Sequence, residues 1–427
     1  MLGVGPRGPL GRDVPGDGGG PARIAERDAW VVVAGVTGVG PVSFGRLLFA
    51  FGSAIGIAEA ASAPKAALRL QEATIGPDGG SPSLSAEAAA ELVAAIGNPG
   101  PHLRRVERSG LTVVTLVDDA YPSRLRLVDL PPPVLFVRGD PAALESRHPV
   151  AVVGTRRPTG VGRATAARIA EGLAAAGAVV VSGLALGVDG AAHAAAVRAG
   201  VPTVAVIGGG HDHLYPAAHR GLAASIAAGG GAVVSEFAPD TTPTRGTFPR
   251  RNRIISGLTD ATVVVEAGIR SGALTTAAWA LEQGRGLFIV PGRMDDPAVA
   301  GSLAFLREGG PQAKIVVGVA ELLEDLDLGN DEGTVDVHGR AAGAVSGGLG
   351  PAGNAVQGAL LAGASGVDEL VAATGLRGAV ILGVLTKLED MGLAVETFGR
   401  YHPAGALAAG GRRTPVKTAR RAGPAAA

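Results

Sequence analysis

The chain of 427 residues contains no cysteine, and its lysine plus arginine residues balance its aspartate plus glutamate residues at 38 each. The first absence excludes disulfides, thiol catalysis and zinc sites built on cysteine. The charge balance means that any attraction to a polyanion must come from a local patch. Aromatic residues make up only 3% of the chain, and no apolar run reaches membrane-spanning length. The N-terminus lacks the apolar core of a signal peptide, so we expect a cytoplasmic protein without a membrane segment.

One segment departs from this neutral background. Residues 244–256 read Thr-Arg-Gly-Thr-Phe-Pro-Arg-Arg-Asn-Arg-Ile-Ile-Ser and surround Phe248 with four arginines, Arg245, Arg250, Arg251 and Arg253. Guanidinium groups attract phosphates and an exposed ring stacks on a base, a combination that suits a single-stranded nucleic acid. A solvated charge run at a loop-to-helix junction fits the same residues, so their neighbours must decide between the two.

The N-terminal quarter of the chain contains two segments of different composition. Glycine and proline dominate residues 1–25, which we interpret as a disordered leader. Residues 26–107 are expected to form a small helical domain, in which Val36–Pro41 supplies a Gly-x-Gly turn before an apolar-periodic segment. Such a turn is typical of a helix-hairpin-helix element, whose amides can approach a phosphate. A plain tight turn fits equally well, because no lysine or arginine flanks it closely.

Short β-branched runs alternate with helical segments over residues 108–327, which predicts an α/β domain with a doubly wound sheet. Near-continuous apolar runs, such as 151–153 and 178–181, indicate a sheet covered on both faces. The predicted strands are 113–117, 134–138, 150–153, 179–181, 203–207, 232–235, 262–266, 286–290 and 315–317. The predicted helices are 162–176, 191–199, 216–228 and 274–283.

Three further parts follow the sheet. Residues 328–354 are rich in glycine and alanine without a period and are expected to be a flexible linker. Residues 355–403 contain two apolar-faced helical segments followed by 395–401, which predicts a helix–turn–helix with a short β-wing. Residues 404–427 are expected to form a basic, disordered tail.

Ligands of a doubly wound sheet bind beyond the carboxyl ends of the strands, and four glycine-bearing loops are predicted there. These loops are 154–158, 182–189, 208–210 and 266–276. In the first, Thr155 offers a hydroxyl and Arg156 a forked donor that matches phosphate oxygens. In the last, Ser271, Gly272 and the helix start at Thr275 offer donors to an anion. Together the loops favour a phosphate-bearing ligand, although none has the dinucleotide fingerprint or a Walker A lysine, so no cofactor is expected.

Two residue groups offer other interpretations. His211, His213 and His219 invite a metal site, but they follow a triple glycine in a loop, and we expect no metal because stable sites need three or four ligands with outer-shell support. Asp189 and His193, four residues apart, suggest an acid–base pair, whereas helix capping by Asp189 is the simpler interpretation. No catalytic residue is predicted.

Taken in order, these motifs resemble those of the DNA-processing protein A family (DprA/Smf). The segments that carry the resemblance are 121–125, 133–136, 154–156, 181–193, 214–216, 235–236, 248–255, 271–277 and 291–293. The resemblance implies an extended Rossmann-like domain over 108–327 and a SAM-like or helix-hairpin-helix domain over 26–107. It also implies a winged-helix domain over 355–403.

The resemblance further implies a non-enzymatic protein that binds and protects single-stranded DNA in natural transformation and recombination, forms a homodimer and helps to load RecA recombinase. Arg156 is then expected to grip a phosphate and Phe248 to stack on a base. The predicted DNA- or phosphate-binding residues are Gly154, Thr155, Arg156, Ser182, Gly183, Arg245, Phe248, Arg251, Asn252, Arg253, Ser271, Gly272 and Thr275.

The alternative is an enzyme with a related Rossmann-like pocket, of the nucleoside-monophosphate phosphoribohydrolase type. Those enzymes show a Pro-Gly-Gly-x-Gly-Thr signature that leads to a catalytic glutamate. The corresponding loop here, 267–276, contains no acidic residue, which favours binding over hydrolysis.

Overall fold

The computed structural model describes residues 24–77, 79–308, 312–328, 350–390, 393–397 and 400–403. Most of the predicted leader, most of the predicted linker and the whole predicted basic tail lie outside these residues. The described residues divide into two compact units, one before residue 333 and one after it.

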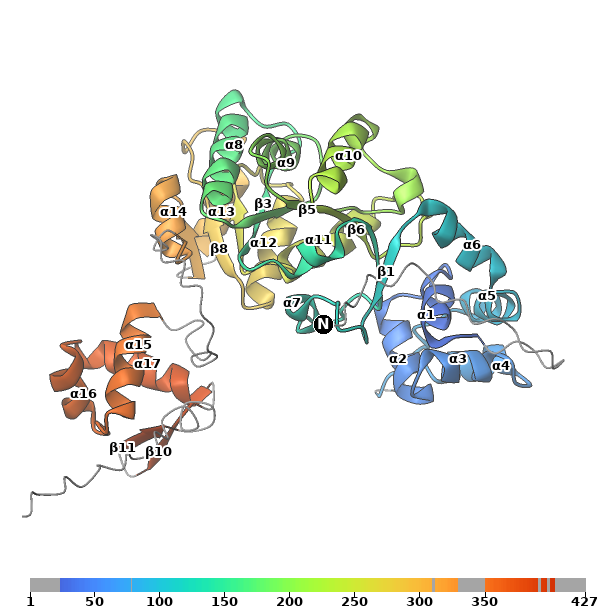
Figure 1. The fold of residues 1–427 in the computed structure, drawn as a ribbon, viewed down its shortest axis with the longest axis horizontal. Coiled ribbons are helices and arrows are strands. Elements are labelled where there is room, and N and C mark those ends of the chain that lie inside the picture. The colour runs from blue at the N-terminus through green and yellow to red at the C-terminus, as the bar shows by residue number, and fades with distance from the viewer. Residues whose placement is uncertain are drawn as a thin grey trace, which may run out of the picture. The chain divides into compact units, whose positions relative to one another are not determined.

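A nine-stranded sheet forms the centre of the first unit (Figure 1). Its strands overlap all nine predicted segments, and their order across the sheet is β1-β2-β6-β5-β4-β3-β7-β8-β9. The bounds are β1 Thr112–Thr115, β2 Val134–Gly139, β3 Pro149–Val153, β4 Val179–Ser182, β5 Thr203–Val206, β6 Ala232–Ser235, β7 Ala261–Val264, β8 Gly286–Ile289 and β9 Ala313–Ile315. The order reverses between β3 and β7, so the predicted doubly wound sheet is confirmed, with its switch point at these two strands.

The sheet is mixed rather than parallel throughout, because β2 runs antiparallel to both β1 and β6. This direction brings the end of β2 to the edge at which β3 begins. The short connection 140–148, with the 3₁₀ turn η1 (Pro141–Glu145), then runs beside β5 and β6 to reach β3 without a crossover helix. An apolar strand carries no signal of its direction, so the sequence did not predict this exception.

Helices cover both faces of the sheet (Figure 1). One face packs against α8 (Gly160–Ala175), α9 (Val188–Arg198), α10 (Arg220–Ala228) and α14 (Val319–Asp325). The other packs against α7 (Ser123–Arg126), α11 (Thr247–Gly257), α12 (Ala273–Glu282) and α13 (Ala300–Glu308). Alternate residues of one strand enter opposite cores, as Val152 and Val153 do, which explains the near-continuous apolar runs.

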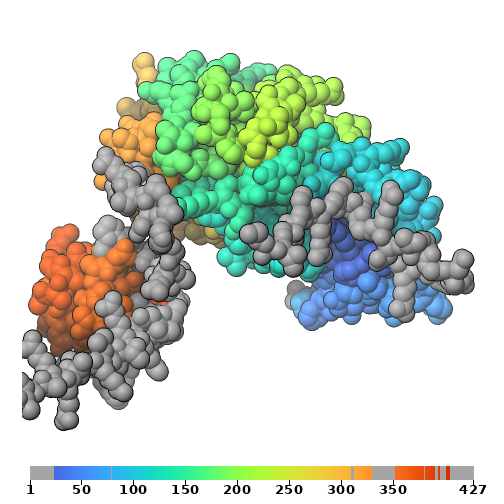
Figure 2. Space-filling view, viewed as in Figure 1, coloured from blue at the N-terminus to red at the C-terminus, as the bar shows by residue number. Residues whose placement is uncertain are grey.

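Among the described residues, six helices precede the sheet and pack against its antiparallel edge (Figures 1 and 2). They are α1 (Glu26–Ala34), α2 (Pro41–Phe51), α3 (Ala54–Ala61), α4 (Ala66–Glu72), α5 (Ala86–Gly97) and α6 (Gly100–Ser109). Trp30 of α1 stacks on Phe44 of α2 with 4.9 Å between ring centroids, and their shared core extends to Val134 and Phe136 of β2. Among the described residues no single helix is long and apolar enough to cross a bilayer; α2 and α3 reach that length only as a pair bent by 85°.

The described residues of the second unit form three helices followed by a hairpin. The elements are α15 (Gly350–Leu361), α16 (Val367–Thr374), α17 (Gly378–Asp390), β10 (Ala394–Thr397) and β11 (Arg400–Pro403). Leu370 and Leu385 lie in its apolar core, and Glu369 closes the start of α16 by accepting from the amide of Gly366 at 3.2 Å. Both α16 and α17 overlap the predicted helical segments, and β10 and β11 overlap the predicted β-wing at 395–401. The assignment of a winged-helix domain stays a prediction.

Two of the three histidines singled out in the sequence, His211 and His219, have separate structural partners. His211 donates from Nε2 to the carbonyl of Phe136 at 2.9 Å, and His219 donates from Nδ1 to the carbonyl of Leu184 at 2.8 Å. Within the described part of the chain no three acidic or histidine side chains gather into a metal-binding group. Burial lowers the pKa of His211 to about 4, so this residue is neutral in the folded protein near pH 7.

We expect His211 to make the fold sensitive to acid. Its pKa in the unfolded chain is about 6.5, above the folded value, so its contribution is complete above pH 6.5 and is lost as the pH falls toward 4. The loss amounts to about 3 kcal/mol of unfolding free energy. His211→Gln keeps a donor for Phe136 and should show a shallower decline in denaturation series between pH 7 and 4. Parallel declines for parent and variant would contradict this assignment.

Candidate nucleic-acid interface

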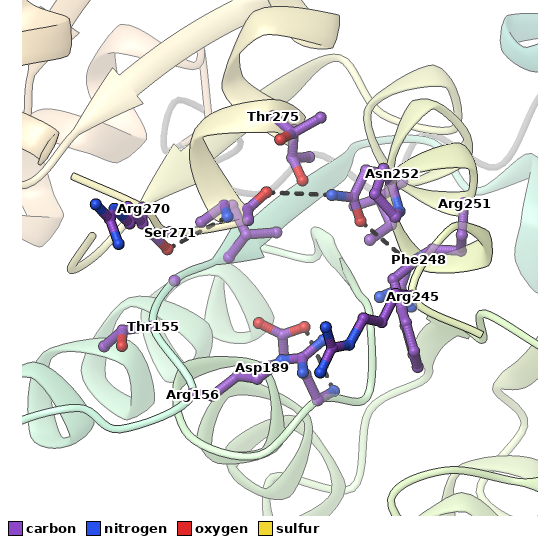
Figure 3. Close-up of a pocket in the computed structure, with 18 of the residues that line it drawn as sticks. Thr155, Arg156, Asp189, Arg245, Phe248, Arg251, Asn252, Arg270, Ser271 and Thr275 are labelled. Carbon is purple, nitrogen blue, oxygen red and sulfur yellow. Dashed lines mark hydrogen bonds between the residues drawn. The ribbon is translucent and has the colours of Figure 1, made fainter. Parts of the chain in front are cut away.

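A cavity of about 1030 Å³ opens at the carboxyl edge of the sheet, where β3 and β7 meet (Figure 3). We call it the edge cavity. Five chain segments line it, namely the segments that follow β3, β4, β5 and β7, and the segment 243–255, which includes most of α11. Ten of the thirteen predicted binding residues are among its lining residues: Gly154, Thr155, Arg156, Arg245, Phe248, Arg251, Asn252, Ser271, Gly272 and Thr275.

The basic cluster of the sequence is largely helical, because α11 spans Thr247–Gly257. Five α11 residues line the edge cavity: Phe248, Pro249, Arg251, Asn252 and Ile255. All but Pro249 follow the i, i+3, i+4, i+7 spacing of one helix face. Arg250 and Arg253 lie on other faces of the same helix. The sequence prediction treated all four arginines as one group, and helical geometry separates them.

Arg251 forms part of the cavity floor and is 4% exposed. Its Nη1 donates to the carbonyl of Gly183 at 2.7 Å and to that of Val206, so it joins the ends of β4 and β5. A Cβ on Gly183 would stand 2.7 Å from the guanidinium, which explains the glycine. Burial lowers the pKa of Arg251 to about 10, and nearby Asp189 acts in the opposite direction. Arg251 is therefore a charged structural support below the cavity.

Asn252 connects α11 to the loop after β7. Its Nδ2 donates to the carbonyl of Gly272 at 3.1 Å (Figure 3). In that loop the hydroxyl oxygen of Ser271 accepts from the amide of Ala273 at 3.3 Å, which leaves its O–H free to donate. No acceptor lies within reach of the Gly272 amide or the Thr275 hydroxyl among the described residues. The loop thus presents several donors at the start of α12, as an anion site requires.

An aromatic platform stands opposite this loop. Phe248 is half-buried, and the guanidinium carbon of Arg156 lies 5.2 Å from its ring centroid. Tyr215 meets Phe248 edge-on, with 5.9 Å between the centroids. Phe248 packs closely on the loop after β5, since a Cβ on Gly208 would lie 2.7 Å from its ring. The ring is therefore fixed in place with a cation beside it, an arrangement that suits stacking on a base.

The structure adds lining residues that the sequence prediction missed, chiefly Arg157, Arg270 and Tyr215. Both arginines are exposed and directly adjoin predicted residues, Arg156 and Ser271. That adjacency was the available signal, but the sequence does not show which of two neighbouring side chains turns inward. Tyr215 lies in a family motif, and only the fold brings it to Phe248.

Three predicted residues, Ser182, Gly183 and Arg253, do not line the edge cavity. The hydroxyl of Ser182 is fully buried and donates to the carbonyl of Val152 at 2.6 Å, between neighbouring strands. Arg253 forms a buried ion pair with Glu236 at 2.5 Å, with side chains 6% and 5% exposed. The geometry therefore gives Ser182 and Arg253 structural contacts instead of ligand contacts.

Two loop interpretations need correction. The glycines 208–210 do not line the edge cavity. A Cβ on Gly210 would lie 2.2 Å from the carbonyl oxygens of Ala238 and Pro239, so the absence of a side chain there lets the backbone of 238–239 pack closely. Asp189 does not cap α9, whose N-cap is Gly187. Its carboxylate instead accepts from the amides of Gly183 and Ala185 in the preceding loop. Burial raises the pKa of Asp189.

Asp189 and His193 do not act as a pair. The hydroxyl of Thr203 donates to the carbonyl of Val180 at 2.6 Å, so it accepts from Nδ1 of His193 at 2.8 Å. His193 is fully buried between α9 and β5 and is absent from the cavity lining. The hydrogen bond to Thr203 gives His193 a structural role between α9 and β5.

Comparison with known proteins identifies the same family that the sequence motifs resemble. A sequence model of the family described as DNA recombination-mediator protein A matches residues 112–327, half of the chain. The chain belongs to this family. The predicted resemblance is thereby confirmed, and with it a role in DNA processing.

Individual relatives support the same assignment. The DNA processing protein DprA of Bacillus subtilis is 38% identical over 230 residues, which cover 53% of this chain and 76% of the relative. Protein Smf of Escherichia coli is 44% identical over 209 residues, 49% of this chain and 55% of the relative. The X-ray structure of DNA processing protein A from Streptococcus pneumoniae superposes with a TM-score of 0.58 at 28% identity, covering 71% of this chain and 98% of that one.

We expect the arginines of this recombination-mediator motif to differ in their effect on stability. Arg253→Ala leaves the buried carboxyl of Glu236 without its cation and should lower the unfolding free energy by about 3 kcal/mol or more. Arg156→Ala removes an exposed side chain and should change it by less than about 0.5 kcal/mol. Urea denaturation of both variants checks this; equal losses would refute the division into structural and free arginines.

Proposed function

We propose that this recombination-mediator protein binds single-stranded DNA in the edge cavity. The observation that carries the proposal is a set of four exposed cavity-lining guanidinium groups around one aromatic platform: Arg156, Arg157, Arg245 and Arg270. In the described part of the chain none of the four is paired with a carboxylate. They are therefore available to phosphates.

The form of the site favours a single strand over a duplex. Phe248 and Tyr215 can receive a base only where it is unstacked and free to turn inward. The donors of the Ser271–Gly272 loop lie opposite, where they can contact the adjoining backbone phosphate. Exposed cations and a ring fixed by Gly208 give affinity without reading base edges, which is typical of binding with little sequence preference.

The assembly of the protein is part of the same proposal. We infer a homodimer and a role in loading RecA recombinase, which the family resemblance implies. The edge strand β9 supports an interface at that end of the sheet, since Ile315 and Val317 there are 52% and 76% exposed. Protection of a strand by a paired protomer fits a mediator that delivers DNA to a recombinase.

The flanking parts are proposed to be DNA-processing modules. We interpret residues 26–107 as a SAM-like or helix-hairpin-helix domain, supported by the Gly-x-Gly turn between α1 and α2. Residues 355–403 are interpreted as a winged-helix domain, supported by three helices followed by a strand pair. The Rossmann-like domain between them holds the edge cavity.

The phosphoribohydrolase alternative requires a carboxylate free to act on a sugar. Glu266, after β7, accepts from the amide and the hydroxyl of Thr159 at 3.0 and 2.8 Å. The Asp189 carboxylate accepts from loop amides. Both acids therefore have roles in holding loops. Release of free base on incubation with nucleoside monophosphates would nevertheless show that the protein is a phosphoribohydrolase.

The proposal predicts a salt-dependent affinity for single-stranded oligonucleotides. Four phosphate contacts at about 0.7 each give a log–log salt slope of about −3 per protomer. Arg245→Ala should reduce the slope by about 0.7, whereas Arg198→Ala, a change to an exposed arginine at the far end of α9, should leave it unchanged. Fluorescence anisotropy at several salt concentrations measures both.

Loss of a stacking contact should affect binding differently from loss of a phosphate contact. Phe248→Ala should weaken binding by about 1–3 kcal/mol with the salt slope unchanged, because it removes a base contact and no phosphate contact. Binding by Phe248→Ala and Arg245→Ala that equals the parent's would remove the edge cavity as the site.

A further inference from the structure

A second hollow, of about 630 Å³, lies on the other side of α11 from the edge cavity. We call it the turn pocket, because the turn 34–41 between α1 and α2 forms one wall and the segment 236–244 forms another. Thr244 lines both hollows, whereas Thr247 and Arg250 of α11 line only the turn pocket. The two hollows are therefore neighbours that share one chain segment and one helix.

Arg250 gives the turn pocket a free cation. Its guanidinium carbon lies 5.5 Å from the ring centroid of Phe237, and no carboxylate pairs with it among the described residues. Its Nη2 also approaches the turn, since a Cβ on Gly40 would stand 3.4 Å away. The turn lacks flanking basic residues in its own sequence, and the fold supplies one from α11.

The turn adds backbone donors beside this cation. Gly38, at φ +89°, and Gly40 carry N–H groups with no acceptor in the described structure. The amides of Val42 and Ser43, in the first turn of α2, are also free. Such converging amides at a helix start favour an anion.

The Glu236–Arg253 ion pair leaves hydrogen-bonding capacity unused beside the turn pocket. The side chain of Glu236 is 5% exposed, lies in the pocket wall and pairs with Arg253 through Oε2. Its Oε1 and the Nη1 of Arg253 both have no hydrogen-bond partner among the described residues. A buried acceptor without a partner costs about 1–3 kcal/mol, so it favours an occupant with N–H groups. Nucleobases carry such groups, and inorganic anions do not.

The other charged groups of the turn pocket nearly cancel. Arg105 pairs with Asp240 at 3.2 Å, and Glu236 with Arg253 at 2.5 Å. Burial lowers the pKa of His102, so it adds no charge near pH 7. Glu91 is the remaining acid in the lining and Arg250 the remaining base. The pocket therefore suits one nucleotide, with one phosphate near Arg250, rather than a long polyanion.

We propose that the turn pocket binds a further nucleotide of the strand that occupies the edge cavity. Arg250 and the turn amides hold its phosphate, and its base lies toward Glu236. The strand passes over Thr244, so the N-terminal helices take part in binding. This inference rests on the proposed function of the edge cavity.

Oligonucleotide length separates the two sites in the full-length protein. Arg250→Ala should weaken binding of a strand of about sixteen nucleotides several-fold and reduce the salt slope by about 0.7. With a strand of about four nucleotides, which fills only the edge cavity, the variant should bind like the parent. Arg69→Ala, a change to an exposed arginine of α4 outside both hollows, is the matched control.

Gly40→Asp is a second variant, and a loss of binding in it cannot be explained by a loss of folding. Gly40 is the N-cap of α2 in an extended conformation, a position that aspartate favours, so the helix should be at least as stable. The new carboxylate lies beside Arg250 and competes with a phosphate, so binding of the longer strand should weaken several-fold.

The outcomes distinguish the inference from the function on which it rests. Parent-like binding of long strands by Arg250→Ala and Gly40→Asp, with Phe248→Ala still defective, overturns the turn pocket alone. Weaker binding of the short strand by Arg250→Ala also overturns it, because Arg250 would then belong to the edge cavity. Parent-like binding by all the variants, including Phe248→Ala, overturns the proposed function itself.

Discussion

The arrangement of the edge cavity depends on the buried guanidinium group of Arg251. It donates to carbonyls at the ends of β4 and β5, and the adjacent Asn252 donates to Gly272 beyond β7. Any rotation of α11 about its axis would break these bonds and leave a buried cation without partners, which is strongly unfavourable. Three strand ends therefore hold α11 in one orientation, and that orientation turns Phe248 toward the cavity.

The same helix divides its arginines between structure and binding. Arg251 and Arg253 are buried and committed to protein partners, whereas Arg250 is exposed on another face. Buried charges make the site rigid before a ligand arrives, so the exposed guanidinium groups and the ring need little reordering on binding. A neutral chain can hold a polyanion in this way because the free cations are concentrated at one edge of the sheet.

The sequence was sufficient for the positions of the strands and for three of the four predicted loops, but not for the orientation of side chains. Strands such as β3 were predictable because both faces are buried and the run is apolar throughout. The α11 helix was missed, since Pro249 and the arginines give it no apolar period. Without that helix, Arg253 could not be separated from its neighbours. The glycines at 208–210 indicated that another group packs closely against the backbone there. Only the fold shows that this group is another segment of the protein and not a ligand.

The most direct test is a crystal structure of the full-length protein with a short single-stranded oligonucleotide. The account predicts a base against Phe248, phosphates at Arg156 and the Ser271–Gly272 loop, and Arg251 still bonded to the carbonyl of Gly183. A strand bound on another face with the edge cavity empty would contradict it. So would an Arg251 side chain that has left the floor to bind a phosphate.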